Sequence, residues 1–190
     1  MTVTVVFETH STSEDNERGI ATGWLPGRLS SIGRRQAAEL GARRRDDGFA
    51  VVYTSDLARA AETARIAFAG SGLEVIEDGR LRECDYGRWN GMPRARLEAE
   101  RLARIDVPWP GGESWRAAVD RVAGFLDELA TARDGRRVLL IGHVATRFAL
   151  DLRSGDRPLE ALVEAPFRWR PGWEYEVDRQ VAHTSDRKKP

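Results

Sequence analysis

A short apolar run near the N-terminus, from Val3 to Phe7, ends abruptly in polar residues. Its five residues are mostly β-branched or aromatic and too few for a helix, a pattern typical of a strand buried on both faces. His10 comes just after the carboxyl end of this run. In open α/β sheets ligands bind at that edge, where loops meet helix N-termini whose free N–H groups favour anions. His10 is therefore a candidate catalytic residue.

Short apolar runs alternate with segments that favour helices along the rest of the sequence. The expected further strands lie at 49–53, 73–76 and 138–141. The expected helices, most of which begin at a capping residue or a proline, lie at 32–45, 57–68, 93–103, 114–131 and 145–152. Residues 17–29 are expected to form a loop, and 167–169 and 173–177 a late hairpin. The alternation predicts a three-layer α/β/α sandwich with a mainly parallel sheet.

The composition is that of one globular domain. A chain of 190 residues without repeats or linkers predicts one domain over 1–178 and a polar tail over 179–190. Thirty basic residues balance thirty acidic ones, so no overall field favours nucleic acid or a membrane surface. The single cysteine, Cys84, fits a reducing compartment. Without an apolar span or a signal-peptide pattern, we expect a cytoplasmic protein, and the sequence leaves a homodimer open.

Three further polar residues are expected at the same edge of the sheet as His10. His143 directly follows the strand at 138–141, so it lies beyond a second buried strand. Arg59 falls in the first turn of the helix at 57–68, where a cation opposes the helix dipole, and this local cost favours a binding role. Glu83 lies in an irregular stretch with glycine punctuation. These four residues narrow the functions that the architecture allows.

Several stretches have the order and spacing of motifs in one known family. His10 is followed six positions later by Asn16, and further on by Gly23 and Trp24. The later stretches are Leu29–Gly33, Tyr53–Ala64, Arg80–Gly87, Gly111–Ser114 and Gly142–His143. In these features the sequence resembles the histidine phosphatase superfamily, in its phosphoglycerate-mutase-like branch, from Val3 to about Leu152.

The resemblance implies a reaction and a role for each residue. His10, as a neutral imidazole, would attack phosphorus and form a phosphohistidine. Glu83 would protonate the leaving oxygen and then accept a proton from the attacking water. Arg59 and His143 would hold the equatorial phosphoryl oxygens, and no metal or cofactor is required. The residues expected to contact a small, phosphorylated substrate around them are Glu8, Thr9, Ser11, Asn16, Gly23, Trp24, Arg28 and Val144.

The sequence departs from the family's Arg-His-Gly motif, because Thr9-His10-Ser11 stands in its place. The arginine that clamps the phosphate beside the nucleophile is absent, and one such donor is worth ~10²–10³ in rate. Either Arg18 or Arg28 takes its place in space, or the pocket no longer handles an ordinary phosphate monoester.

Glu8 stands at a position that is usually apolar, and two roles are open for it. Strand parity puts it on the side of His10, where it would contact the ligand. The alternative is a buried ion pair with Arg59 or Arg28. Other residues have structural alternatives too: Glu83 would pair with Arg80 or Arg88, Arg59 would form a surface ion pair, and Trp169 and Trp173 would either close a pocket or pack in the core.

Three functions from different classes remain. We favour a metal-independent phosphatase of a small phosphorylated metabolite that acts through a phosphohistidine on His10. The second is an enzyme with changed acid–base chemistry on a substrate that lacks phosphate, which Glu8 and Thr9 favour. The third is a binding domain without turnover, which the joint presence of His10, Arg59, Glu83 and His143 disfavours. A mutase is disfavoured by the chain's shortness, and a zinc site by histidine spacing that fits no local ligand motif.

Overall fold

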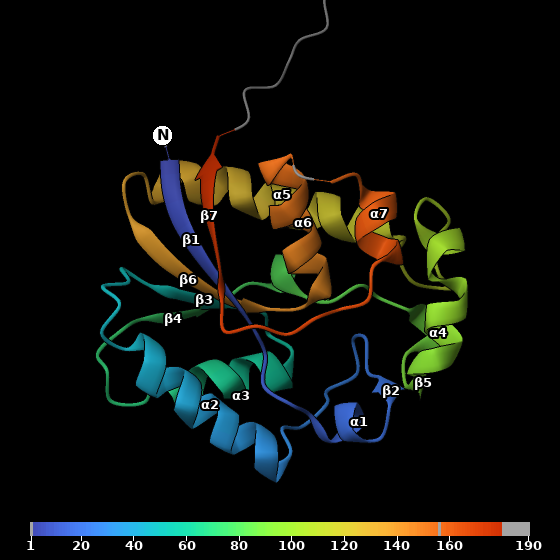
Figure 1. Ribbon diagram of the computed structural model, residues 1–190, viewed down its shortest axis with the longest axis horizontal. Helices are drawn as coiled ribbons and strands as arrows, with labels where there is room; N and C mark the ends of the chain where they lie inside the picture. The colour runs from blue at the N-terminus through green and yellow to red at the C-terminus, as the bar shows by residue number, and fades with distance from the viewer. Residues whose placement is uncertain (1, 156, 180–190) are drawn as a thin grey trace, which may run out of the picture.

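The computed structural model of the chain describes residues 2–155 and 157–179 and is built on a five-stranded sheet (Figure 1). The strands, in their order across the sheet, are β4 (Val75–Glu77), β3 (Val52–Thr54), β6 (Arg137–Gly142), β1 (Thr2–Thr9) and β7 (Trp173–Asp178). The first four run parallel, and β7 pairs antiparallel with β1. The prediction of a mainly parallel sheet is confirmed.

The pairing of β1 with β6 brings the two predicted catalytic histidines to the same edge. Thr9 lies opposite Gly142 in the parallel register, so both strands end at the same level. The His10 N–H extends this ladder by one bond to the Gly142 carbonyl, at 3.0 Å. Because the carboxyl ends of parallel strands share one edge of the sheet, His10 and His143 emerge side by side.

Helices cover both faces of the sheet, as the alternation predicts (Figure 1). On one side lie α5 (Trp115–Ala132) and α6 (Val144–Ser154), and on the other α2 (Ser31–Arg44) and α3 (Ala58–Ala67). Residues of β1 alternate between the two: Val3, Val5 and Phe7 belong to the larger apolar core with α5 and α6, and Val6 to a smaller one with α2 and α3. A buried sheet with both faces covered explains the continuous apolar run of β1.

The shorter elements gather near the carboxyl edge of the parallel strands and build the surroundings of the site. They are α1 (Glu14–Glu17), β2 (Ile20–Ala21), η1 (Gly79–Leu81), η2 (Gly87–Trp89), β5 (Met92–Pro93), α4 (Arg94–Glu100), η3 (Arg101–Arg104) and α7 (Leu159–Glu164). β2 and β5 pair as a separate two-stranded sheet. The predicted loop at 17–29 therefore contains a short strand, and the predicted helix at 93–103 tightens into a 3₁₀ turn after Glu100.

The predicted late hairpin is wrong. Residues 167–169 form no strand, and β7 pairs with β1 instead of with a neighbour in sequence. Trp173 and Val177 of β7 face the core and the glutamates between them are exposed, an alternation that suits a strand at the edge of a large sheet. The sequence analysis also missed α7, although Leu159, Leu162 and Val163 have the spacing of a buried helix face.

Three predictions about the chain as a whole stay untested. Apart from Arg179, the predicted tail at 179–190 lies outside the described residues. No helix among the described residues combines the length and apolarity that a membrane crossing requires. The cytoplasmic location and the homodimer remain predictions.

Candidate active site

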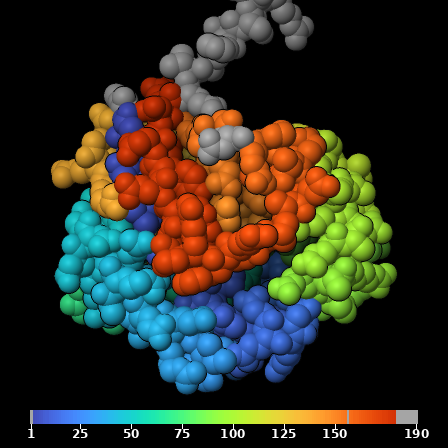
Figure 2. Space-filling view, viewed as in Figure 1, coloured from blue at the N-terminus to red at the C-terminus, as the bar shows by residue number. Residues whose placement is uncertain are grey.

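A cavity of about 940 Å³ opens where β1 and β6 end. Figure 2 shows the surface hollowed between the C-terminal segment, α4 and the N-terminal part of the chain. Polar side chains from the strand ends line it together with aromatic side chains, among them Tyr86, Trp109, Trp115, Phe167 and Trp169. A concave site with a few converging polar groups in an apolar surround is typical of small-molecule binding. Of the predicted site residues, all but Trp24 and Arg28 line this cavity.

His10 is held as a neutral imidazole with one nitrogen unprotonated. Its Nδ1 lies 2.8 Å from the Ser11 carbonyl oxygen, which accepts only, so Nδ1 carries the proton and Nε2 has a lone pair. The Nε of Arg59 donates a long hydrogen bond, of 3.4 Å, to that Nε2. Burial, with a smaller contribution from the Arg59 cation, lowers the pKa of His10 from 6.5 to about 3. At neutral pH the lone pair of Nε2 is therefore available as a nucleophile.

Arg59 is a buried cation that contacts both histidines. It is 3% exposed, and its Nη2 donates to the Gly23 carbonyl at 2.9 Å and lies 3.4 Å from His143 Nδ1. Gly23 has a left-handed backbone (φ 55°), and a Cβ there would meet the Asn90 side chain at 1.8 Å, so only glycine fits. Among the described residues Arg59 forms no ion pair with a carboxylate, so the alternative of a surface ion pair is wrong. A buried guanidinium bound only to neutral groups is a site for an anion.

His143 is the N-cap residue of α6, and like His10 it lies next to Arg59. Its Nε2 lies 2.7 Å from the Ser55 hydroxyl, and its ring centroid is 5.0 Å from that of His10. Burial and then the Arg59 cation hold the pKa of His143 well below its usual value. The sequence analysis missed Ser55, whose place between β3 and α3 marks it as a residue at a strand end.

Glu83 lies at the N-terminus of α6. Its Oε1 accepts hydrogen bonds from the N–H groups of Cys84 (2.9 Å) and Ala145 (3.1 Å), and its Oε2 from Val144 (3.2 Å). Free N–H groups at a helix start hold a carboxylate in place. Within the described part of the chain Glu83 pairs with neither Arg80 nor Arg88, so that structural alternative is wrong.

Glu8 is buried, but its partners differ from those predicted. It is 1% exposed, and its Oε1 lies 2.9 Å from Arg44 Nε and 3.7 Å from Arg43 Nη2. The predicted pairing with Arg59 or Arg28 is therefore wrong. The reason is strand parity, because Glu8 follows Val6 on the face that α2 covers, and the last turn of α2 presents both arginines. Glu8 also lines the cavity.

Arg18 and Arg28 do not take the place of the missing arginine beside His10. Both are exposed and neither lines the cavity, and Arg18 lies 4.0 Å from Glu14. Thr9 and Ser11 line the cavity beside His10, and the Ser11 N–H donates to the Thr63 hydroxyl at 3.0 Å.

Other arginines, which the sequence analysis did not assign to the site, line the cavity. They are Arg43, Arg94 and Arg101. Arg43, in the last turn of α2, is exposed and also lines the cavity. The two tryptophans separate: Trp169 lies at the cavity and is 61% exposed, whereas Trp173 packs on Phe7 in the core, with ring centroids 5.6 Å apart.

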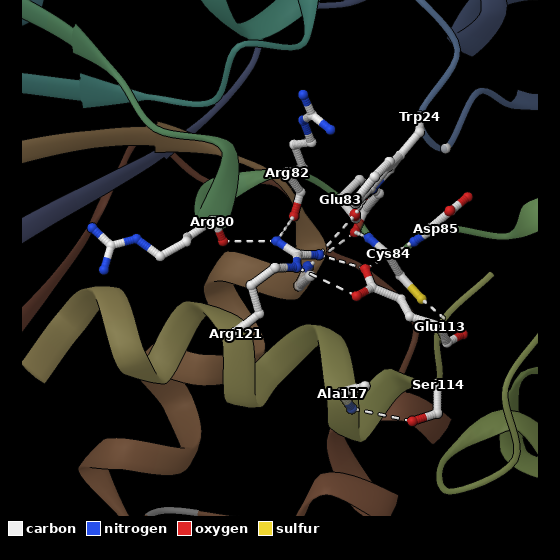
Figure 3. Close-up of polar contacts among 12 residues, drawn as sticks. Trp24, Arg80, Arg82, Glu83, Cys84, Asp85, Glu113, Ser114, Ala117 and Arg121 are labelled. Atoms are coloured by element: carbon white, nitrogen blue, oxygen red, sulfur yellow. Dashed lines mark hydrogen bonds and ion pairs between the residues drawn. The ribbon is translucent and has the colours of Figure 1, made fainter.

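Trp24 and Asn16 support the site from its margin. Trp24 Nε1 donates to the Glu83 carbonyl at 2.6 Å (Figure 3), although Trp24 itself does not line the cavity. Asn16 closes a capping box with Ser13 at the start of α1 and also lines the cavity. The described residues contain no group of three or more His, Cys, Asp or Glu side chains arranged to hold a metal ion.

Curated proteins with both mutase and phosphatase names are similar to this chain. It is 34% identical over 154 residues to a 2,3-bisphosphoglycerate-dependent phosphoglycerate mutase of Parvibaculum lavamentivorans, covering 73% of each chain. It is 30% identical over 160 residues to phosphoserine phosphatase 1 of Hydrogenobacter thermophilus, covering 78% of this chain and 74% of that protein.

Solved structures share the fold. Bacillus stearothermophilus YhfR superposes with a TM-score of 0.81 at 24% identity, covering 95% of this chain and 98% of that one. A mycobacterial glucosyl-3-phosphoglycerate phosphatase superposes with a TM-score of 0.72 at 26% identity, covering 84% and 83%. The sequence model of the histidine phosphatase superfamily (branch 1) matches residues 6–166. The chain is thus a member of the histidine phosphatase superfamily, branch 1.

Proposed function

We propose that the chain is a phosphatase that hydrolyses a small phosphorylated metabolite through a phosphohistidine on His10, without a metal. The observation that carries the proposal is the unprotonated Nε2 of His10, to which the Nε of the buried Arg59 donates at 3.4 Å. A nucleophile needs a lone pair, and a phosphoryl group needs a cation next to it. Both requirements meet at this nitrogen.

The reaction takes two displacements. In the first, His10 Nε2 attacks phosphorus, the ester P–O bond breaks, and Glu83 gives a proton to the leaving alkoxide. In the second, water attacks phosphorus, the N–P bond breaks, and Glu83 takes the water's proton as phosphate departs. Arg59 and His143 hold the phosphoryl oxygens, whose charge a preorganised donor stabilises in the transition state.

The proposed site is atypical in its cations. Thr9 stands where the family motif has arginine, and Arg18 and Arg28 lie outside the cavity. If no other cation reaches the phosphoryl group, turnover should be ~10²–10³ slower than with a full set of donors. Among the cavity arginines, Arg43 lies in the last turn of α2. It is the first arginine to test for compensation.

The hypothesis of changed acid–base chemistry is less favoured. It assigns Glu8 to the reaction, but the Glu8 carboxylate is tied to Arg44 and Arg43 on α2.

The test is phosphate release from a panel of phosphorylated metabolites, with the intact protein, His10→Ala and a control, Arg116→Gln. Arg116 pairs with Asp106 and Glu160 on the surface and lies outside the cavity. We expect phosphate release that His10→Ala abolishes and that neither Arg116→Gln nor a chelator changes. We also expect an acid-labile phosphate on the protein after quenching. Equal release by His10→Ala would reject the proposal. Conversion of 3-phosphoglycerate that depends on 2,3-bisphosphoglycerate, without phosphate release, would favour a mutase.

A further inference from the structure

An ion pair outside the cavity ties the loop that carries Glu83 to α5. Arg121 Nε lies 3.3 Å from Glu113 Oε2, and Arg121 Nη2 also contacts Glu113 Oε1, so the pair is bidentate. Each side chain is 19% exposed, and neither lines the cavity. We propose that Arg121 and Glu113 position Glu83 for proton transfer to the leaving group, an inference that rests on the proposed phosphatase function.

Arg121 binds the backbone of the Glu83 loop (Figure 3). Its Nη1 donates to the carbonyl oxygens of Arg80 (2.7 Å) and Arg82 (3.2 Å), and its Nη2 to that of Glu83 (3.2 Å). The planar guanidinium presents its N–H groups in a fixed fork, so three carbonyls bound to it have fixed relative positions. Arg121 itself is fixed because it extends from α5, the longest helix.

Glu113 binds the loop on the other side of Glu83. Its Oε1 accepts the Asp85 N–H at 3.0 Å, and its own N–H donates to the Asp85 carbonyl at 3.0 Å. The pair therefore anchors the backbone both before and after Glu83. The carboxylate that orients Arg121 is the same one that holds Asp85, which makes the two anchors interdependent.

Trp24 completes the support of the Glu83 peptide. Its Nε1 donates to the Glu83 carbonyl, which thus accepts two hydrogen bonds, one from Trp24 and one from Arg121. The guanidinium carbons of Arg82 and Arg121 lie 4.6 and 5.7 Å from the centre of a Trp24 ring. Both lone pairs of this carbonyl are then occupied, which fixes the plane of the peptide.

A fixed backbone matters here because proton transfer needs a close approach. A general acid must come within ~2.6–3.2 Å of the oxygen it protonates, and a displacement of about 1 Å costs on the order of 10²-fold. Without Arg121, the carbonyls of Arg80 and Arg82 lose this donor, that of Glu83 keeps only Trp24, and Glu113 loses its cation. His10 and Arg59 are held by other contacts, to Gly142 and Ser11 and to Gly23, and keep their positions.

The test compares esters that differ in their need for an acid. The leaving group of p-nitrophenyl phosphate departs as a stable anion, whereas that of glycerol phosphate must be protonated. Arg121→Gln should lower kcat/KM for glycerol phosphate by about 10–100-fold and for p-nitrophenyl phosphate by less than about threefold. We compare kcat/KM because it reports the step in which His10 is phosphorylated and the alcohol leaves. Glu83→Gln serves as the reference and should show a larger selective loss.

Two further variants separate positioning from stability. Arg80→Gln removes an arginine and its two ion pairs, to Asp78 and to Glu128, of which the second links the same loop to the same helix. Because the Arg80 side chain does not bind the Glu83 peptide, both esters should react as before. Glu113→Gln keeps one acceptor oxygen, which can still serve Arg121 Nη2 and the Asp85 N–H, and loses the acceptor for Arg121 Nε, so its selective loss should be smaller than that of Arg121→Gln.

Equal losses on both esters with Arg121→Gln would overturn the inference, since a role in stability alone lowers both in proportion to the folded fraction. If Arg121→Gln does not fold, Arg121→Lys, which keeps a cation on Glu113, should show an intermediate selective loss, and an unselective loss would overturn the inference. The proposed function fails separately, if the unaltered protein shows no His10-dependent phosphate release from either ester or from any metabolite of the panel.

Discussion

Removal of Arg44 should destabilise the protein more than removal of Arg44 and Glu8 together. Glu8 is 1% exposed and its closest cation is Arg44, at 2.9 Å. Arg44→Leu leaves this carboxylate buried with only Arg43, at 3.7 Å. Breaking a buried ion pair costs about 3–5 kcal/mol, and we expect the lower end, about 3 kcal/mol, because Arg43 compensates in part. Arg44→Leu also loses its contact with Asp47.

Urea unfolding at pH 7 measures the free energy of unfolding of Arg44→Leu, Glu8→Leu and the double variant. In the double variant no buried charge is left uncompensated, so about 2 kcal/mol of the loss should return. A matched control is Arg116→Leu, whose ion pairs are exposed, and it should cost less than about 1 kcal/mol. A double variant as unstable as the sum of the two single ones would refute the argument that Glu8 is an uncompensated charge without Arg44.

Three other predictions follow from the site. The pKa of His10 falls from 6.5 to about 3 on folding, so between these pH values only the unfolded chain binds this proton. The free energy of unfolding should therefore decrease as the pH drops from 6.5 toward 3. In urea titrations His10→Gln should weaken this dependence on pH. Ser55→Ala removes the partner of His143 Nε2 and should lower kcat about tenfold while the melting temperature shifts by only a few degrees, measured by steady-state kinetics and calorimetry. Gly23→Ala should lower kcat/KM, since its Cβ would clash with Asn90 and displace the carbonyl that holds Arg59, and unchanged kinetics would contradict this.

Much of the site could be predicted because it depends on local patterns. Val3–Phe7 and 138–141 are recognisable as buried strands, and parallel strands end at a common edge, so the proximity of His10 and His143 followed from their places after these runs. Arg59 was predicted from the dipole cost of a cation in a first helical turn.

What the sequence did not reveal depends on which elements pack together. Parity assigns Glu8 to a face of the sheet, but only the tertiary structure shows that the end of α2 covers that face and supplies Arg44. Arg101 lies in a polar segment without a clear apolar face, so nothing in its pattern marks it as part of a cavity wall. The aromatic residues at 167–169 suggested a strand that would pair with 173–177, but β7 pairs with β1, at the other end of the sequence.

The place of β1 between β6 and β7 determines when the site can form. The strand before His10 is the first element of the chain, yet both of its neighbours in the sheet come after residue 136. During synthesis β1 therefore stays unpaired on both edges until β6 and β7 have been made. Pairing over such long sequence separations is slow, and an apolar strand with free edges is prone to join other chains. The arrangement that aligns the two histidines thus makes the site one of the last features that the fold can complete.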